Sequence, residues 1–259
     1  MFDPVTSSLY VGDCLDVIER YPNVISGSHL LITSPPYNFG REYDSIEDNI
    51  DNDNYFSTLE KIFSSIYRLA NDSFRMVIVV KDNYAKMQFT ALDLYSTLKG
   101  LNWKPYAYFV LKSGHFSRQT SWGSWLSPSA PRIRCQHELA LVFYKKTYKR
   151  DNKTQEISKQ DFIDFTKSVY YDDDLFVSDV DKRLHPAQFS PNLVKRFVKL
   201  FSFKGDTVID IFNGMGNTGL ASLYCGRNYI GIDISKNYIL ASKKIFLKNG
   251  FKNISIKLT

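Results

Sequence analysis

Four consecutive residues near the start of the chain, Ser34-Pro35-Pro36-Tyr37, have types and an order that could do chemistry. They follow the apolar run 30–32, which is typical of a buried strand. Two consecutive prolines cannot donate hydrogen bonds to a sheet, and they hold the chain in a stiff, extended corner. Such a corner presents a hydroxyl, two acceptor carbonyls and an aromatic face, which suits a site that grips a flat ring bearing an amine. A strand-ending turn with an incidental tyrosine is the structural alternative.

A second candidate site lies far downstream, in the segment Gly214-Met215-Gly216-Asn217-Thr218-Gly219. This G-x-G-x-x-G pattern stands between a predicted strand and a predicted helix, as in loops that bind dinucleotides or other adenosine-bearing cofactors. In such a loop the first glycine permits a tight turn, the second lets the backbone approach a ligand, and the third lets the helix pack closely. Asp233 ends the next predicted strand, where it could accept hydrogen bonds from ribose hydroxyls. A turn without a ligand is again the structural alternative.

Two features argue against a dinucleotide in this loop. Asp210 stands on the strand just before it, and a carboxylate there would repel a pyrophosphate but suit an ammonium or sulfonium group, as in S-adenosylmethionine. Only 46 residues remain from Gly214 to Thr259, too few to complete an ordinary dinucleotide-binding sheet. The N-terminal strands must therefore complete it, which predicts a circularly permuted, doubly wound, mostly parallel sheet with helices on both faces.

The predicted elements alternate between strands and helices, as a parallel sheet requires. Hydrophobic patterns predict strands at 9–11, 30–33, 76–80, 106–111, 139–144, 207–211 and 229–232. They predict helices at 15–19, 55–69, 84–98, 191–201, 218–225 and 236–247. Residues 41–54 are polar and without period, which indicates a mobile loop, and 145–182 form a polar stretch, first basic and then acidic, which indicates an insert.

Composition restricts the class of protein. A chain of 259 residues that is 44% hydrophobic can bury a large core, and no apolar stretch approaches the roughly 18 residues that span a bilayer. The first residues lack the pattern of a signal peptide. Three scattered cysteines, Cys14, Cys135 and Cys225, argue against a disulfide framework or a metal site, so we expect a cytoplasmic protein without a membrane partner. The net charge of +6 is compatible with a polyanionic partner without requiring one.

The order of the two motifs resembles the β-class of S-adenosylmethionine-dependent DNA amino-methyltransferases, in which the catalytic motif precedes the cofactor motif. The segments 34–37 and 210–216 are similar to these motifs, and further similarities lie at 12–15, 126–143 and 185–189. The chain departs from the family at Ile211, commonly Pro, and at Asn217, commonly Ser or Thr. The resemblance implies a Rossmann-like fold with a catalytic half (1–144), a target-recognition insert (145–182) and a cofactor-binding half (183–259).

The resemblance also implies a reaction and its residues. A DNA base is flipped out of the duplex, and its exocyclic amine takes a methyl group from S-adenosylmethionine. Ser34 and the backbone carbonyl after it would accept hydrogen bonds from the amine, and Tyr37 would stack on the ring. Serine in the first motif position favours N4 of cytosine, while N6 of adenine, in DNA or in RNA, stays open. The implied catalytic residues are Ser34, Pro35, Pro36 and Tyr37, and the implied cofactor-binding residues are Asp13, Cys14, His185, Asp210, Phe212, Gly214, Gly216, Asn217, Thr218 and Asp233.

The implied partner is double-stranded DNA, in a restriction-modification context with a cognate restriction endonuclease and at a prokaryotic nucleoid. Basic residues that we expect on loops flanking the catalytic corner are candidates for DNA contact: Arg41, Lys112, Arg118, Arg132, Arg134, Lys145 and Lys146. For Trp122 and Trp125, packing in the core or a loop is favoured over stacking on DNA. The sequence leaves open whether the protein is a monomer or a homodimer. A nicotinamide-dependent oxidoreductase and a cofactor-binding protein without catalysis are the alternatives from other classes.

Overall fold

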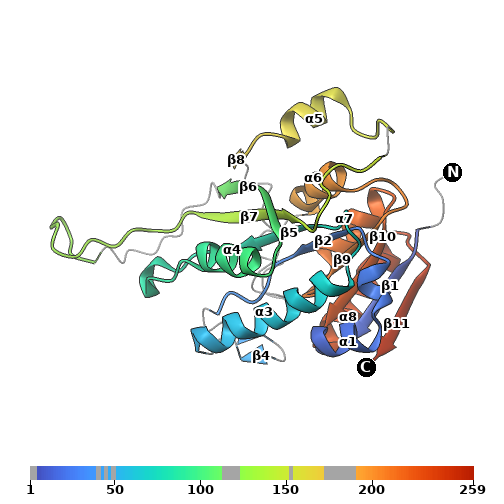
Figure 1. Cartoon of the computed structure of the whole chain (residues 1–259), viewed down its shortest axis with the longest axis horizontal. Helices are drawn as coiled ribbons and strands as arrows, with labels where there is room; N and C mark the ends of the chain where they lie inside the picture. The colour runs from blue at the N-terminus through green and yellow to red at the C-terminus, as the bar shows by residue number, and fades with distance from the viewer. Residues whose placement is uncertain are drawn as a thin grey trace.

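The main element of the fold is a sheet of nine strands in the order β11-β1-β10-β9-β2-β5-β7-β6-β8 (Figure 1). The computed structural model describes residues 5–38, 42–43, 46–47, 51–112, 123–151, 154–171 and 191–259. β7 is antiparallel to β5 and β6, and the other pairings in this sheet are parallel. The strands are β1 (Ser7–Val11), β2 (Leu30–Thr33), β5 (Arg75–Val80), β6 (Lys104–Lys112), β7 (His137–Tyr144), β8 (Val169–Tyr171), β9 (Thr207–Asp210), β10 (Asn228–Asp233) and β11 (Ile254–Leu258).

Strands from the two ends of the chain lie side by side in the middle of this sheet. β9 pairs with β2 through Leu30 with Val208 and Leu31 with Ile209, and β10 pairs with β1. The N-terminal strands therefore complete the sheet that carries the glycine loop. This arrangement confirms the predicted permuted, doubly wound, mostly parallel sheet.

Helices cover both faces of the sheet, and each face has its own hydrophobic core. α1 (Cys14–Arg20), α2 (Asn23–Ser26), α3 (Asn52–Leu69) and α4 (Thr90–Gly100) pack on one face. α6 (Pro191–Phe201), α7 (Asn217–Tyr224) and α8 (Lys236–Lys248) pack on the other. Because successive strand residues point to opposite faces, β5 supplies apolar side chains to both cores and all six of its residues are buried.

The structure differs from the sequence-based expectation at 84–98, where a single helix was predicted. A short 3₁₀ turn, η1 (Tyr84–Lys86), ends at Met87 in the left-handed region (φ 55°), and α4 begins only at Thr90. Two side chains explain the break. Asn83 accepts a hydrogen bond from the Lys86 N–H, and Asp82 Oδ1 accepts one from the Ala91 N–H at 3.0 Å, which caps the new helix.

Four smaller elements, β3, β4, α2 and β11, were also not predicted. The segment 41–54 contains two-residue strands, β3 (Glu42–Tyr43) and β4 (Ile46–Glu47), which pair with each other, and its last residues open α3. α2 is a single turn, and β11 is an edge strand with exposed side chains. Such short or half-exposed elements have a weak hydrophobic pattern, so periodicity does not reveal them.

The predicted insert 145–182 is attached to the sheet where the structure describes it. It contains α5 (Lys159–Phe165) and β8, and β8 extends the sheet beyond β6. The Lys199 ammonium of α6 lies 2.9 Å from the Asp161 carboxylate of α5. Tyr170 of β8 packs on Phe109 of β6 with ring centroids 5.4 Å apart.

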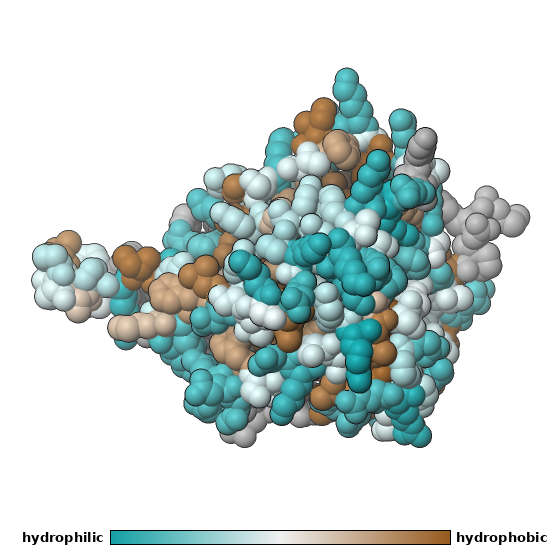
Figure 2. All heavy atoms as spheres, in the orientation of Figure 1, coloured by the Kyte–Doolittle hydropathy of each residue, from teal (hydrophilic) through white to brown (hydrophobic). Residues whose placement is uncertain are grey.

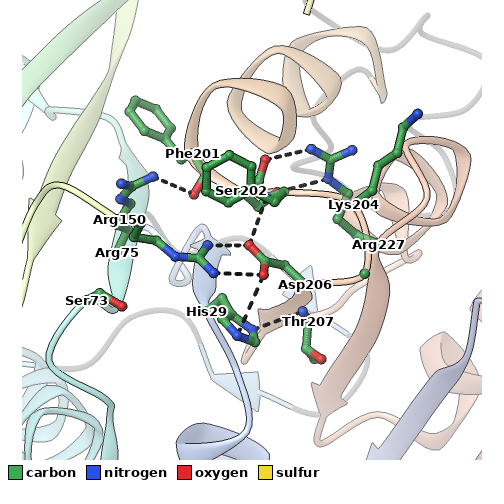
Figure 3. Close-up of polar contacts among 12 residues, drawn as sticks. His29, Ser73, Arg75, Arg150, Phe201, Ser202, Lys204, Asp206, Thr207 and Arg227 are labelled. Carbon is green, nitrogen blue, oxygen red and sulfur yellow. Dashed lines mark hydrogen bonds and ion pairs between the residues drawn. The ribbon is translucent and has the colours of Figure 1, made fainter. Parts of the chain in front are cut away.

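A network of charged side chains closes the edge of the sheet where the parallel strands begin (Figure 3). The buried carboxylate of Asp206 accepts two hydrogen bonds from the Arg150 guanidinium and one from the Phe203 N–H at 2.8 Å. His29 lies on the same carboxylate, with its Nε2 3.6 Å from Asp206 Oδ1. Nearby, the buried Arg227 pairs with Glu156 at 2.9 Å. These contacts fasten the segment that follows β7 to the turn before β9.

Replacing Asp206 with Asn tests this network. The substitution leaves the Arg150 guanidinium without its buried counter-charge, so we expect the free energy of unfolding to fall by about 3–5 kcal/mol. The matched control Asp72→Asn breaks the exposed pair of Asp72 with Lys146 (3.1 Å) and should cost at most about 1 kcal/mol. Urea unfolding of both variants at pH 7 measures the difference, and equal losses would contradict the assignment.

The unfolding free energies of Asp206→Asn and of the unsubstituted protein should differ less at low pH than at neutral pH. Burial alone would raise the pKa of Asp206, but the hydrogen bonds from Arg150 and from the Phe203 backbone hold it below its ordinary value. A lowered carboxyl pKa contributes stability above the unfolded-state value, and that contribution is lost as pH falls through the folded-state value. Urea unfolding of both proteins at pH 7 and pH 3 checks the sign.

Candidate functional site

The catalytic corner and the strand that leads to the glycine loop touch through one hydrogen bond. The Thr33 hydroxyl, at the end of β2, donates to Asp210 Oδ1, at the end of β9, over 2.7 Å. Both side chains are buried, and 177 positions of sequence separate them. Ser34 is the next residue after Thr33, so the two predicted motifs lie at one edge of the sheet. The sequence analysis missed Thr33, although its position at the end of a strand next to the corner was a usable signal.

Within the described part of the chain, the hydrogen-bond donors to the buried Asp210 carboxylate are all neutral. It accepts hydrogen bonds from Thr33, from Thr218 and from the Phe212 N–H at 3.1 Å. Burial, with a smaller contribution from the charge of Asp233, raises its pKa to about 6 against the opposing effect of these hydrogen bonds. A cationic ligand group beside it would offset the cost of burying the charge. The site therefore fits an ammonium or sulfonium ligand.

The glycine loop is held in shape by side chains from β10 and α8. Asp233 Oδ2 accepts a hydrogen bond from the Gly214 N–H at 2.6 Å, and its Oδ1 accepts one from the Ser235 N–H at 2.9 Å. Gly216 has φ 81° and directly precedes α7, which begins at Asn217. A side chain at Gly219 would put its Cβ 2.4 Å from the Phe246 ring, so glycine is required there for helix packing. The predicted residues Phe212, Gly214, Gly216, Asn217, Thr218 and Asp233 thus come together in this loop or beside it.

The corner itself is stiff and largely covered. Pro35 and Tyr37 are buried, and Ser34 and Pro36 are half-buried. The Tyr55 hydroxyl, in the first turn of α3, donates to the Pro36 carbonyl over 2.8 Å and fixes its direction. No sequence signal marked Tyr55, because a single aromatic residue in a helix is usual in a core. The Tyr37 ring is 3% exposed, so stacking a base on it requires its surroundings to move.

Two more predicted cofactor residues lie at the same edge. Asp13 and Cys14 follow β1, whose last residue pairs with Asp233 of β10. The Asp13 carboxylate accepts the Leu15 N–H at 2.8 Å and caps α1, while the Cys14 thiol is buried, which raises its pKa. His185, the remaining predicted cofactor residue, lies outside the described residues.

The candidates for DNA contact separate into two groups. Lys112 and the segment with Arg132 and Arg134 lie where β6 ends and β7 begins, at the edge of the sheet that carries Ser34. Lys145 and Lys146 lie at the opposite edge, because they follow Tyr144, which pairs with the first residue of β5. The expectation that these two lysines flank the catalytic corner is therefore wrong. Arg41, Arg118 and Trp122 lie outside the described residues.

The environment of two residues adds to these corrections. Lys145 is 8% exposed, and its ammonium donates to the Ala70 carbonyl at 2.6 Å, as a structural side chain does. Trp125 was predicted to pack in the core or a loop, yet its side chain is 64% exposed. Packing in the core is therefore wrong for Trp125.

Two classes of site find no support in the described part of the chain. Its histidines, cysteines and carboxylates form no group of three or more that could hold a metal ion. Across the same residues, every helix is too short or too polar to cross a lipid bilayer.

Comparison with known proteins agrees with this geometry. A type II methyltransferase of Haemophilus parainfluenzae, M.HpaI, is 24% identical over 95% of this chain and 77% of its own. The structure of a putative DNA modification methylase of Thermus thermophilus, complexed with S-adenosyl-L-methionine, superimposes with a TM-score of 0.75 at 24% identity. It covers 97% of this chain and 98% of the other. The cytosine-N4-specific PvuII DNA methyltransferase gives a TM-score of 0.72 at 19% identity, over 98% and 93% of the two chains.

Both structures share the fold described above. The family model N6_N4_Mtase, described as DNA methylase, matches residues 28–244, which include the catalytic corner, Asp210 and the glycine loop. The match spans well over half of the chain. The protein therefore belongs to the N6/N4 DNA methylase family.

Proposed function

We propose that this protein transfers a methyl group from S-adenosylmethionine to the exocyclic amine of a flipped base in double-stranded DNA, at N4 of cytosine. The observation that carries the proposal is the 2.7 Å hydrogen bond between Thr33 and Asp210. It holds the amine-gripping corner and the cation-binding carboxylate next to each other in a chain of the DNA methylase family. Neither motif alone would support the assignment.

The cofactor site is built from the ends of β9, β10 and β1. S-adenosylmethionine, when bound, supplies an electrophilic methyl group carried on a sulfonium ion. Asp210 offers its buried carboxylate to the cationic part of the ligand, and the Gly216 backbone lets the ligand approach α7 closely. Asp233 ends β10 beside the glycine loop and accepts the Gly214 N–H, which puts its carboxylate where it can meet the ribose hydroxyls. Asp13 and Cys14 face the adenine in this arrangement.

The corner prepares the amine of the base. Ser34 Oγ and the Pro35 carbonyl accept hydrogen bonds from the amine, which makes its nitrogen more pyramidal and its lone pair less delocalised into the ring. Tyr55 holds the following Pro36 carbonyl in place, so the acceptors of the corner keep one orientation. Catalysis then depends on positioning and on stabilising the developing charge, and no covalent intermediate is needed. Tyr37 stacks on the base once the ring is uncovered.

Ser34 supports cytosine as the target. A neutral hydroxyl can accept a hydrogen bond from either amine, and the family covers both N6 and N4 methylation, so adenine is the second candidate. The likeness to a type II methyltransferase supports a restriction-modification context, with a cognate endonuclease as partner.

Methyl transfer from labelled S-adenosylmethionine to mixed-sequence duplex DNA tests the function. We expect label in the DNA and, after digestion to nucleosides, in N4-methylcytosine, because Ser34 stands first in the corner. Label in N6-methyladenine would reverse the choice of base. A protein that binds the cofactor yet labels neither nucleoside would refute the proposal.

Substitution of Tyr37 by Ala should separate base stacking from cofactor binding. Removal of the ring takes away a contact of about 1–3 kcal/mol with the flipped base, so we expect methylation to fall by roughly 10- to 100-fold. The affinity for S-adenosylmethionine, measured by calorimetric titration, should stay within about twofold, since the ring lies in the corner and not in the glycine loop. Tyr37→Phe keeps the ring and serves as the matched control. Parallel losses of methylation and cofactor affinity in Tyr37→Ala would contradict the stacking role.

Substitution of Asp210 by Asn should raise the free energy of unfolding and lower the affinity for S-adenosylmethionine. The raised pKa of about 6 means that ionisation destabilises the fold, so this destabilisation is absent below the ordinary carboxyl pKa and complete above pH 6. We expect Asp210→Asn to raise the free energy of unfolding by about 1–3 kcal/mol at pH 8 and not at pH 3.5.

The same variant should lose cofactor affinity by at least about 100-fold, the equivalent of about 3 kcal/mol, since the buried charge is gone. Urea unfolding at the two pH values and calorimetric titration with S-adenosylmethionine measure the two effects. Unchanged cofactor affinity in Asp210→Asn would remove this carboxylate from the site.

A further inference from the structure

We infer that residues 123–136, called the arm below, are a DNA-binding element that grips the duplex outside the methylated base. The inference rests on the proposed function, because it takes double-stranded DNA as the substrate. It names a contact surface that the catalytic corner and the glycine loop do not include. Three independent features of the arm carry it: its position, its built tip and its exposed side chains.

The arm leaves the body of the protein at the edge that carries the catalytic corner. It leads into β7, whose first residue His137 pairs with Lys112, the last residue of β6. Leu139 of β7 pairs with Val80, the last residue of β5. In Figure 1 the yellow-green chain continues from β7 into a long projection on the side opposite the two termini. DNA that presents a base to Ser34 would therefore approach the edge from which the arm extends.

The tip of the arm is a turn held by hydrogen bonds. The Ser124 N–H donates to the Ala130 carbonyl at 3.0 Å, and the Ala130 N–H donates to Ser124 Oγ at 2.8 Å. Gly123 forms a bridge with Pro131, and a Cβ at Gly123 would lie 2.3 Å from the Ala130 carbonyl oxygen. Leu126 adopts the left-handed region (φ 56°), where a branched side chain is strained. These contacts hold the turn that presents Trp125 and Leu126.

The side chains that this tip presents are apolar and face solvent. Trp125 is 64% exposed and Leu126 87% exposed, and further along the arm Ile133 is 69% exposed. Figure 2 shows hydrophobic residues in brown on the projection and at its base. The turn contains a residue with positive φ, yet it leaves most of the surface of Trp125 and Leu126 exposed to solvent instead of burying it in the fold. Exposed apolar groups of this kind mark a surface that a partner covers.

The charge of the arm selects DNA as that partner. Between Gly123 and Gln136 the chain has two arginines, Arg132 and Arg134, and no acidic residue. Arg132 is exposed and Arg134 half-exposed. Arginines contact phosphates, and apolar side chains enter grooves or press on base steps, so a basic stem with an apolar tip matches a duplex. A purely apolar contact between two protein copies would not call for this charge.

The length of the arm places its contacts away from the flipped base. The eleven residues from Leu126 to Gln136 span at most about 35 Å when extended at about 3.3 Å per residue. At about 3.4 Å per base pair this reach corresponds to roughly ten base pairs. The tip is therefore suited to the flank of the target rather than to the gap that the flipped base leaves.

Affinity for DNA of increasing length tests the inference without requiring methylation. The probes are fluorescein-labelled mixed-sequence duplexes of about 10, 20 and 40 base pairs, and fluorescence anisotropy reports binding at several salt concentrations. Trp125→Ala with Leu126→Ser should weaken binding to the two longer duplexes about tenfold or more, and binding to the shortest much less. Arg132→Gln with Arg134→Gln should weaken binding and reduce the slope of log K against log salt by up to about 2.

Matched controls come from the opposite edge of the sheet. Tyr224→Ala with Leu247→Ser removes an exposed aromatic and an exposed leucine near the ends of α7 and α8. Lys248→Gln with Lys252→Gln removes two exposed positive charges. Both control variants should bind all three duplexes as the unsubstituted protein does. Calorimetric titration with S-adenosylmethionine should give the same affinity for every variant.

Two results would overturn the inference. One is arm variants that bind the longer duplexes as tightly as the unsubstituted protein. The other is a change of oligomeric state without a change in DNA affinity. If light scattering shows that the unsubstituted protein is a dimer and that the arm variants are monomers, the arm joins two copies of the chain. Failure of the proposed function would give a different result. A protein whose DNA affinity depends on the arm but which transfers no methyl group would support this inference and refute the proposed reaction.

Discussion

The hydrogen bond between Thr33 and Asp210 is the contact on which the site depends. Parallel strands that lie next to each other end at the same edge of a sheet, so β2 and β9 deliver their last residues to one place. Asp210 needs donors because it is buried, and Thr33 supplies one at the residue before the catalytic corner. The adjacency of β2 and β9 brings the two motifs together although they lie far apart in the chain. Any displacement of β2 against β9 would change both the corner and the cofactor site.

The two edges of the sheet each have a buried carboxylate, and the pKa values of the two carboxyl groups are shifted in opposite directions. At the edge where the parallel strands begin, Asp206 has Arg150, His29 and a backbone N–H around it, and its pKa lies below the ordinary value. At the other edge, the hydrogen-bond donors to Asp210 within the described residues are neutral, and its pKa rises to about 6. The first carboxylate is fully compensated within the fold and stabilises it. In the proposed function, the cationic group of the ligand would offset the cost of burying the second carboxylate.

The sequence was sufficient to predict most of the longer strands and helices and the two motifs, because these depend on local patterns. The strand 76–80 and the helix 191–201 follow from continuous or periodic apolar residues, and the corner and the glycine loop follow from proline and glycine. The position of Thr33 beside the corner was a usable signal, but its hydrogen bond to Asp210 could not be predicted, and neither could the bond from Tyr55 to the Pro36 carbonyl, because each joins residues from different elements. The same limit explains Lys145, whose ammonium satisfies a carbonyl of Ala70 that no local pattern connects with it. Long-range hydrogen bonds are the part of a site that composition and spacing leave undetermined.

The corner combines rigidity with a covered ring, and this combination constrains how a base can enter. Pro35 and Pro36 fix the backbone, and Tyr55 holds the Pro36 carbonyl, so the acceptors are in place before any substrate arrives. Tyr37 is buried, however, and a base cannot stack on it without displacing what covers it. The acceptors are therefore preorganised while the stacking surface is not. In the proposed reaction, a base that leaves its duplex would meet fixed hydrogen-bond acceptors first, and the energy of those contacts, together with binding to the rest of the duplex, would support the uncovering of the ring.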